Sequence, residues 1–274
     1  MSGKLLLLLG AALMGSLLLV MILGVQRELE EPTVVLVSTG RLLLKQGDAV
    51  VLDEAYALEF DPEAGYLLNS LTDLLVDGRV EALAQQSRYD EAFRPLEYQL
   101  VAQTADGTTL VSAYLTERGL EMSVQDGEGM HQAVAEAAAA RLALLDRNVM
   151  AQYVVLLHAI RAEALDRTFT AAVPQALQST RCHVEGPYTV SFVANGEVRQ
   201  GKQFRLYMDE AEIRLIVEDG QLIGLTDEAR GVVGYDAMRY PEGISLRLPG
   251  SEESSARRAM AERHGTVGQG MSCT

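Results

Sequence analysis

The sequence predicts a mainly β protein of the α+β class: a curved antiparallel meander sheet wraps a central helical hairpin, and one transmembrane helix precedes it. Three observations favour this fold: a charge-free apolar run near the N-terminus, Asp-Gly and Asn-Gly pairs between strand-like segments, and a helical pattern confined to the middle. They divide the chain into an anchor at 1–25, a linker at 26–33, a β-rich domain at 34–249 and a flexible polar tail at 250–274.

The predicted anchor runs from Leu5 to Val25 without a charged side chain. A helix of about 20 such residues crosses the hydrocarbon and pairs its own backbone groups there. Lys4 precedes the run and an acidic stretch follows it, which places the N-terminus in the cytoplasm. A cleaved signal peptide is the alternative, but its apolar core would be shorter and would end in small residues, whereas Ile22 stands at −3 of a cut after Gly24. We therefore expect a single-pass protein whose main domain is extracytoplasmic, in the periplasm.

Turn signals recur through the predicted domain. Asp-Gly and Asn-Gly tolerate the positive φ angles of a type I′ turn, whose twist matches the flanking strands. Four such pairs separate strand-like runs: Asp77-Gly78, Asp106-Gly107, Asn195-Gly196 and Asp219-Gly220. They predict a series of β-hairpins.

The runs between these turns alternate between apolar and polar residues. Leu96, Tyr98 and Leu100 fall on one face of a strand, and Glu97 and Gln99 fall on the other. The same period of two occurs in two later runs, with Phe204, Leu206 and Met208 on one face and then Ile213, Leu215 and Val217. One polar, solvent-exposed face indicates an antiparallel sheet that is covered on one side only.

The middle of the chain, about 129–165, has a helical spacing instead. An alanine-rich stretch from Met130 to Leu145 has its larger side chains on one stripe, and Asp146 or Asn148 is expected to start a second helix. Since a one-faced sheet must bury its apolar side, these two helices are its expected cover, with about seven strands before them and about five after. Two small β domains joined by the helices are the alternative.

Composition and motifs exclude several functions. A net charge of −15 argues against nucleic acid and anionic headgroups as partners. Gly196 to Lys202 matches the start of a phosphate-binding loop, but Gln203 stands where Ser or Thr is needed. The histidines lack the spacing of zinc ligands. Cys182 and Cys273 either pair or remain two thiols. We predict no catalytic, metal or cofactor-binding residue and no enzyme activity.

The layout of residues 38 to 249 resembles the half-barrel lipoprotein carriers of the LolA/LolB-like group and the DUF3108-type periplasmic proteins. The segment Leu145-Asp146-Arg147-Asn148-Val149 through Ile160-Arg161 resembles the Asp-led helix that follows a β-meander in the latter. The resemblance implies a periplasmic half-barrel. The chain departs from these proteins in its uncleaved anchor. This departure argues against a shuttling role, because a tethered carrier cannot cross the envelope alone.

Two functions remain. The first is a membrane-anchored interaction or scaffold subunit of a cell-envelope complex, with envelope proteins as partners. The alternative is a tethered lipid- or lipoprotein-binding module whose concave side leaves an apolar cavity. The candidate lining residues for such a ligand are those expected on inward faces: Leu96, Tyr98, Leu100, Leu110, Tyr114, Met122, Phe204, Leu206 and Met208.

Overall fold

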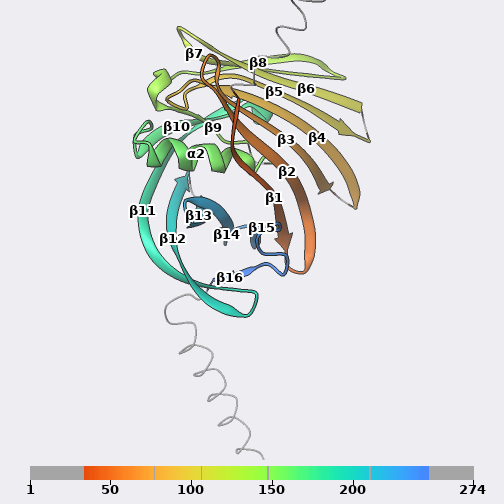
Figure 1. The fold of residues 1–274 in the computed structure, drawn as a ribbon. Coiled ribbons are helices and arrows are strands. Elements are labelled where there is room, and N and C mark those ends of the chain that lie inside the picture. Colours follow the sequence, from red (N-terminus) through yellow and green to blue (C-terminus); the bar gives the residue numbers. More distant parts are fainter. Residues whose placement is uncertain (1–33, 77, 106, 147, 210, 247–274) are drawn as a thin grey trace, which may run out of the picture.

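The computed structural model describes residues 34–76, 78–105, 107–146, 148–209 and 211–246. Within these ranges the chain forms one strongly curved sheet, and the helix α2 (Ala151–Arg161) lies on its concave side (Figure 1). The predicted mainly β fold with a curved antiparallel sheet is confirmed.

The first half of the sheet is an antiparallel meander in which each strand pairs with its neighbours in sequence. Its strands are β1 (Val35–Gln46), β2 (Ala49–Asp61), β3 (Gly65–Val76), β4 (Arg79–Tyr89), β5 (Pro95–Thr104), β6 (Gly107–Thr116), β7 (Gly119–Asp126) and β8 (Gly129–Ala135).

The second half joins the first through β1, which pairs antiparallel with β15. From there the order runs β15–β14–β13–β12–β11–β10–β9; β9 pairs parallel with β10, and β16 pairs with β11 off the main path. The elements are η1 (Ala139–Arg141), β9 (Leu142–Leu144), β10 (Thr168–Val173), η2 (Pro174–Ala176), β11 (Gln178–Ala194), β12 (Glu197–Met208), β13 (Ala211–Glu218), β14 (Gln221–Asp227), β15 (Val232–Asp236) and β16 (Ile244–Leu246).

Alternation along the strands sets which side chains enter the core. In β5 the side chains of Tyr98 and Leu100 are buried, while Gln99 and Val101 are exposed. The hairpin turns are confirmed where both residues are described: Asn195 and Gly196 have φ angles of 50° and 77°. Because both angles are positive, this turn between β11 and β12 is of the predicted I′ kind, and the partial phosphate-loop match is a hairpin.

The core lies between α2 and the inner face of the sheet. Almost every side chain of α2 is buried, which is typical of a helix enclosed on all sides rather than one lying on a surface. The helix contacts strands from both halves, including β2, β3 and β14. A single hydrophobic cluster links Leu58 and Leu68 of the meander with Leu156 of α2 and Leu215 of β13. Each fully buried leucine contributes about 1.5–3 kcal/mol, so the helix and the sheet stabilise each other.

The predicted helical hairpin is half wrong. The second helix is present as α2, but the stretch from Met130 to Leu145 forms β8, η1 and β9. Gly127 and Gly129 lie at the β7–β8 turn, where Asp126 Oδ1 accepts hydrogen bonds from the backbone N–H of Glu128 (2.8 Å) and Gly129 (3.2 Å). Pairing with β7 outweighs the intrinsic helix preference of alanine. The alternative of two separate β domains is also wrong, because β1 and β15 join the halves into one sheet.

The predicted anchor, linker and tail lie outside the described residues, as do residues 247–249 of the predicted domain. Among the residues that the structure describes, no helix has the length and apolar character needed to cross a membrane.

Candidate functional site

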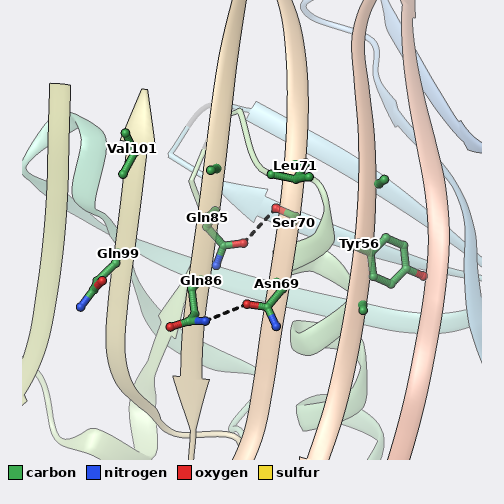
Figure 2. A pocket seen from close by; sticks show the side chains of 11 residues that line it. Tyr56, Asn69, Ser70, Leu71, Gln85, Gln86, Gln99 and Val101 are labelled. Atoms are coloured by element: carbon green, nitrogen blue, oxygen red, sulfur yellow. Dashed lines mark hydrogen bonds between the residues drawn. The ribbon is translucent and has the colours of Figure 1, made fainter. Parts of the chain in front are cut away.

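The outer face of the meander is hollowed over β2, β3, β4 and β5 (Figure 2). This hollow, here called the outer groove, has a volume of about 600 Å³. Its lining residues are Ala55, Tyr56, Ala57, Asn69, Ser70, Leu71, Ala84, Gln85, Gln86, Gln99 and Val101. The lining contains no Asp, Glu, Lys, Arg or His, although the chain has a net charge of −15.

One row of the outer groove is apolar. The strand register places Ala55 opposite Leu71, Leu71 opposite Ala84, and Ala84 opposite Val101. The row continues to Leu110 on β6, which is opposite Val101. Directly paired residues lie on the same face, so these five side chains form a continuous line across the strands, here called the apolar row. Leu71 is 67% exposed, and the alanines Ala55 and Ala84 beside it are also exposed.

The neighbouring row carries amides, and Figure 2 shows them side by side. Asn69, Gln86 and Gln99 are paired across β3, β4 and β5. Gln86 donates a 2.9 Å hydrogen bond to the side-chain oxygen of Asn69, and Gln99 donates a 2.7 Å bond to Glu97. This amide row offers neutral donors and acceptors beside the apolar row. The groove could therefore bind through apolar contacts and through hydrogen bonds between uncharged groups.

Two of the lining residues, Ser70 and Gln85, belong to a buried polar chain on the inner face of the same strands. Ser70 donates a 3.0 Å hydrogen bond to Gln85, and Gln85 donates to Ser87. The hydroxyl of Tyr89, further along β4, has no hydrogen-bond partner in the described part of the chain. Burial raises the pKa of this tyrosine.

Glu54 stands at one end of this polar chain and is completely buried. One of its carboxylate oxygens accepts hydrogen bonds from the backbone N–H groups of Met150 (2.6 Å) and Ala151 (3.0 Å), at the start of α2. Burial raises the pKa of Glu54 to about 7, while the hydrogen bonds from the two N–H groups oppose the shift. The predicted helix starters, Asp146 and Asn148, do not cap α2, and the sequence offers no local signal for a cap from β2.

A second polar contact ties β5 to the segment before α2. The hydroxyl of Tyr98 donates a 2.7 Å hydrogen bond to Asp146, and the backbone N–H of Asp146 donates to the side-chain oxygen of Gln152. Burial, followed by the nearby charge of Asp146, raises the pKa of Tyr98 well above its usual value. This buried pair positions the segment rather than a reacting group, since both side chains are enclosed by the core.

The structure scatters the nine predicted lining residues. Tyr98, Leu100, Met122, Phe204 and Leu206 are members of the packed core cluster, and Met208 packs against it. Leu96 is half-buried on β5. Leu110 and Tyr114 lie on the outer face, each 46% exposed, which corrects their expected inward direction. Their role in binding a ligand stays a prediction.

A separate cavity of about 400 Å³ lies where the ends of β10, β12 and β14 meet the starts of α2, β11 and β13. We call it the rim cavity. It is lined by Leu145, Tyr153, Val173, Gln178, Ser179, Thr180, Met208, Asp209, Ala211, Ile213, Asp227 and Arg230. Sequence reasoning named Met208 but missed Tyr153, Asp227 and Arg230, which are far apart in the chain.

The remaining candidates for chemistry stay apart. No group of three or more metal-binding side chains forms among the residues the structure describes. His131 is exposed on β8, and His158 of α2 stacks on Phe93 with ring centroids 5.9 Å apart. Cys182 is buried, and His183 beside it is exposed, as opposite faces of a strand require. Burial raises the pKa of the Cys182 thiol to about 12.

No family model matches the chain. No curated protein matches it either. Among solved structures, a β-barrel-like protein of the DUF1849 domain family from Brucella abortus aligns with a TM-score of 0.44 at 10% identity, covering 77% of this chain and 96% of that one. A DUF1089 family protein from Pseudomonas aeruginosa aligns with a TM-score of 0.43 at 16% identity, covering 64% of this chain and 89% of that one. The resemblance to the LolA/LolB-like and DUF3108-type groups stays a prediction.

Proposed function

We propose that the protein is a non-enzymatic interaction or scaffold subunit of a membrane-bound cell-envelope complex, and that the outer groove is its docking surface for a partner protein. The N-terminal anchor would hold it at the membrane. The contrast between the two faces of the meander supports the proposal most directly. The inner face is filled by the protein's own core, whereas the outer face is hollowed, and the lining of this hollow contains no charged residue.

The character of the groove favours a protein partner. The centres of protein interfaces are depleted of charged residues and combine apolar contact with neutral hydrogen bonds. The apolar row supplies the first element and the amide row the second. A surface lacking charge in so acidic a chain also limits repulsion at the point of contact. The matching surface would be apolar and would present carbonyl or amide groups to Gln86 and Gln99.

The alternative, a tethered lipid- or lipoprotein-binding module, has less support. It needs an apolar cavity on the concave side, where Leu100, Met122 and Leu206 pack into one cluster with α2. Opening such a cavity would forfeit the burial of these side chains and leave gaps in a close-packed core.

The test is native mass spectrometry on the full-length protein released from its own membranes in mild detergent. The double variant Leu71→Glu with Val101→Glu places charge in the groove. Val198→Glu on β12 is the matched control, since Val198 is 54% exposed and lies outside the groove. We expect stoichiometric masses of partner subunits on the wild type and the control, and their loss from the double variant.

Two results would count against the proposal. Partner masses that persist on the double variant would show that the groove is not the docking surface. A reproducible lipid-sized mass in place of protein partners would favour the tethered carrier.

A further inference from the structure

The lining of the rim cavity includes Asp227 and Arg230, whose side chains do not form an ion pair with each other. Asp227 is 4% exposed and stands on the inner face, in register with Ile213 and Leu206. One of its oxygens accepts a 3.1 Å hydrogen bond from the backbone N–H of Arg230. In the described ranges, the guanidinium of Arg230 forms no ion pair, with Asp227 or with any other acid. A carboxylate buried without a charged partner is costly.

Tyr153 adds an unused polar group to the same cavity. Its side chain is 6% exposed, and among the described residues its hydroxyl has no hydrogen-bond partner. Buried tyrosine hydroxyls usually find a partner. The second acid of the lining, Asp209, is already engaged by the hydroxyl of Thr180. Asp209 is exposed, so the buried polar groups of the cavity are the carboxylate of Asp227 and the phenol of Tyr153, and the exposed guanidinium of Arg230 also belongs to the lining.

The rest of the lining combines apolar side chains with the uncharged polar residues Gln178, Ser179 and Thr180. Leu145, Val173, Met208 and Ile213 contribute aliphatic surface. A volume of about 400 Å³ falls in the range of small-molecule sites, roughly 300–1,000 Å³. An apolar wall beside a few convergent polar groups is the usual composition of such sites.

We propose that the rim cavity binds a small zwitterion, an apolar α-amino acid or dipeptide, with its carboxylate on Arg230 and its ammonium group on Asp227. The guanidinium of Arg230 and the buried carboxylate of Asp227 match a ligand with one negative and one positive group. Arginine suits a carboxylate because its planar fork donates two parallel hydrogen bonds. Tyr153 would bond to the backbone of the ligand, and the aliphatic wall would hold its side chain. The rim cavity shares no residue with the outer groove, so this inference does not rest on the proposed function.

The test titrates L-leucyl-L-leucine, its N-acetyl form and its C-terminal amide against the full-length protein in mild detergent, by isothermal calorimetry. We expect saturable binding of the unmodified dipeptide. Each blocked form should bind at least about tenfold more weakly, because it lacks one charge-assisted contact.

Variants assign the two contacts. Arg230→Gln should weaken dipeptide binding about tenfold, and this variant should bind the dipeptide and its C-terminal amide with equal affinity. Asp227→Asn should bind the dipeptide and its N-acetyl form with equal affinity. Arg79→Gln, on another exposed arginine at the start of β4, should change nothing. Tyr153→Phe should cost several-fold in affinity. Arg230 is exposed, so its variant should fold even where Asp227→Asn does not.

The proposal is overturned if the dipeptide shows no saturable binding at millimolar concentration. It is equally overturned if the three forms bind alike, or if Arg230→Gln and Arg79→Gln behave the same. None of these results bears on partner docking at the outer groove.

Discussion

Glu54 on β2 accepts a 3.0 Å hydrogen bond from the backbone N–H of Ala151, the first residue of α2. The same oxygen accepts a 2.6 Å hydrogen bond from the backbone N–H of Met150. The first N–H groups of a helix have no partner within it, and a carboxylate there also meets the positive end of the helix dipole. A strand residue 97 positions earlier in the chain therefore fixes where the helix begins.

The buried carboxylate makes stability depend on pH. Burial raises the pKa of Glu54 from 4.5 to about 7 in the folded protein. Between these two values the folded state keeps a proton that the unfolded chain releases, so the free energy of unfolding falls as pH rises. The full effect is about 3 kcal/mol. Urea unfolding at pH 5 and pH 8 measures it.

Glu54→Gln is the matched variant, because its amide oxygen still accepts from the helix while its charge no longer titrates. We expect most of the difference between pH 5 and pH 8 to disappear in this variant. Burial also raises the pKa of Asp236, so the comparison with the variant isolates the share of Glu54. An unchanged pH dependence would contradict the assignment.

The hydrogen bond between Tyr98 and Asp146 predicts a second stability effect. Tyr98→Phe removes the donor, so the buried carboxylate of Asp146 loses one of the hydrogen bonds that offset its desolvation. We expect the free energy of unfolding to fall by about 1–3 kcal/mol. Tyr114→Phe is the control, since Tyr114 is 46% exposed on the neighbouring strand β6. Denaturant titration gives both values. Equal losses in the two variants would mean that the buried bond contributes nothing measurable.

Local patterns predicted much of the fold. The period of two in β5, β12 and β13 depends only on which side of a strand is covered, so it could be read directly from residues such as Tyr98 and Leu206. The Asn195-Gly196 turn depends on two residues that tolerate positive φ. Both are properties of short segments.

Relationships between distant segments could not be read in this way. Alanines between Met130 and Arg141 favour a helix locally, and only the partner strand β7 makes β8 extended. Asp126-Gly127 is a turn signal of the same type as the others and could have indicated the hairpin. The outer groove depends on how rows of several strands line up, so Leu110 was expected inside when it lies outside. The rim cavity combines residues from 145 to 230, and no short motif connects them.

The two faces of β5 predict opposite results for adjacent substitutions. Leu100 is 1% exposed and belongs to the core, so Leu100→Glu buries an unpaired charge and should unfold the domain or cost more than about 3 kcal/mol. Val101 is 37% exposed in the outer groove, and Val101→Glu should change stability by no more than about 0.5 kcal/mol. Thermal unfolding followed by circular dichroism compares them. A folded, stable Leu100→Glu variant would indicate a cavity on the concave side and would favour the tethered carrier.

Cys182 is predicted to resist thiol reagents while the protein is folded. Its side chain is 1% exposed, and burial raises its pKa to about 12, so almost no reactive thiolate is present at pH 8. Alkylation by iodoacetamide, followed by peptide mass spectrometry, should leave Cys182 unmodified in the native protein and modify it fully in denaturant. The Cys182→Ala variant, whose only remaining cysteine is Cys273, gives the rate of labelling outside the described residues. Native labelling of Cys182 as fast as that of an unfolded thiol would show that β10 and β11 open readily around it, contrary to its place in the core.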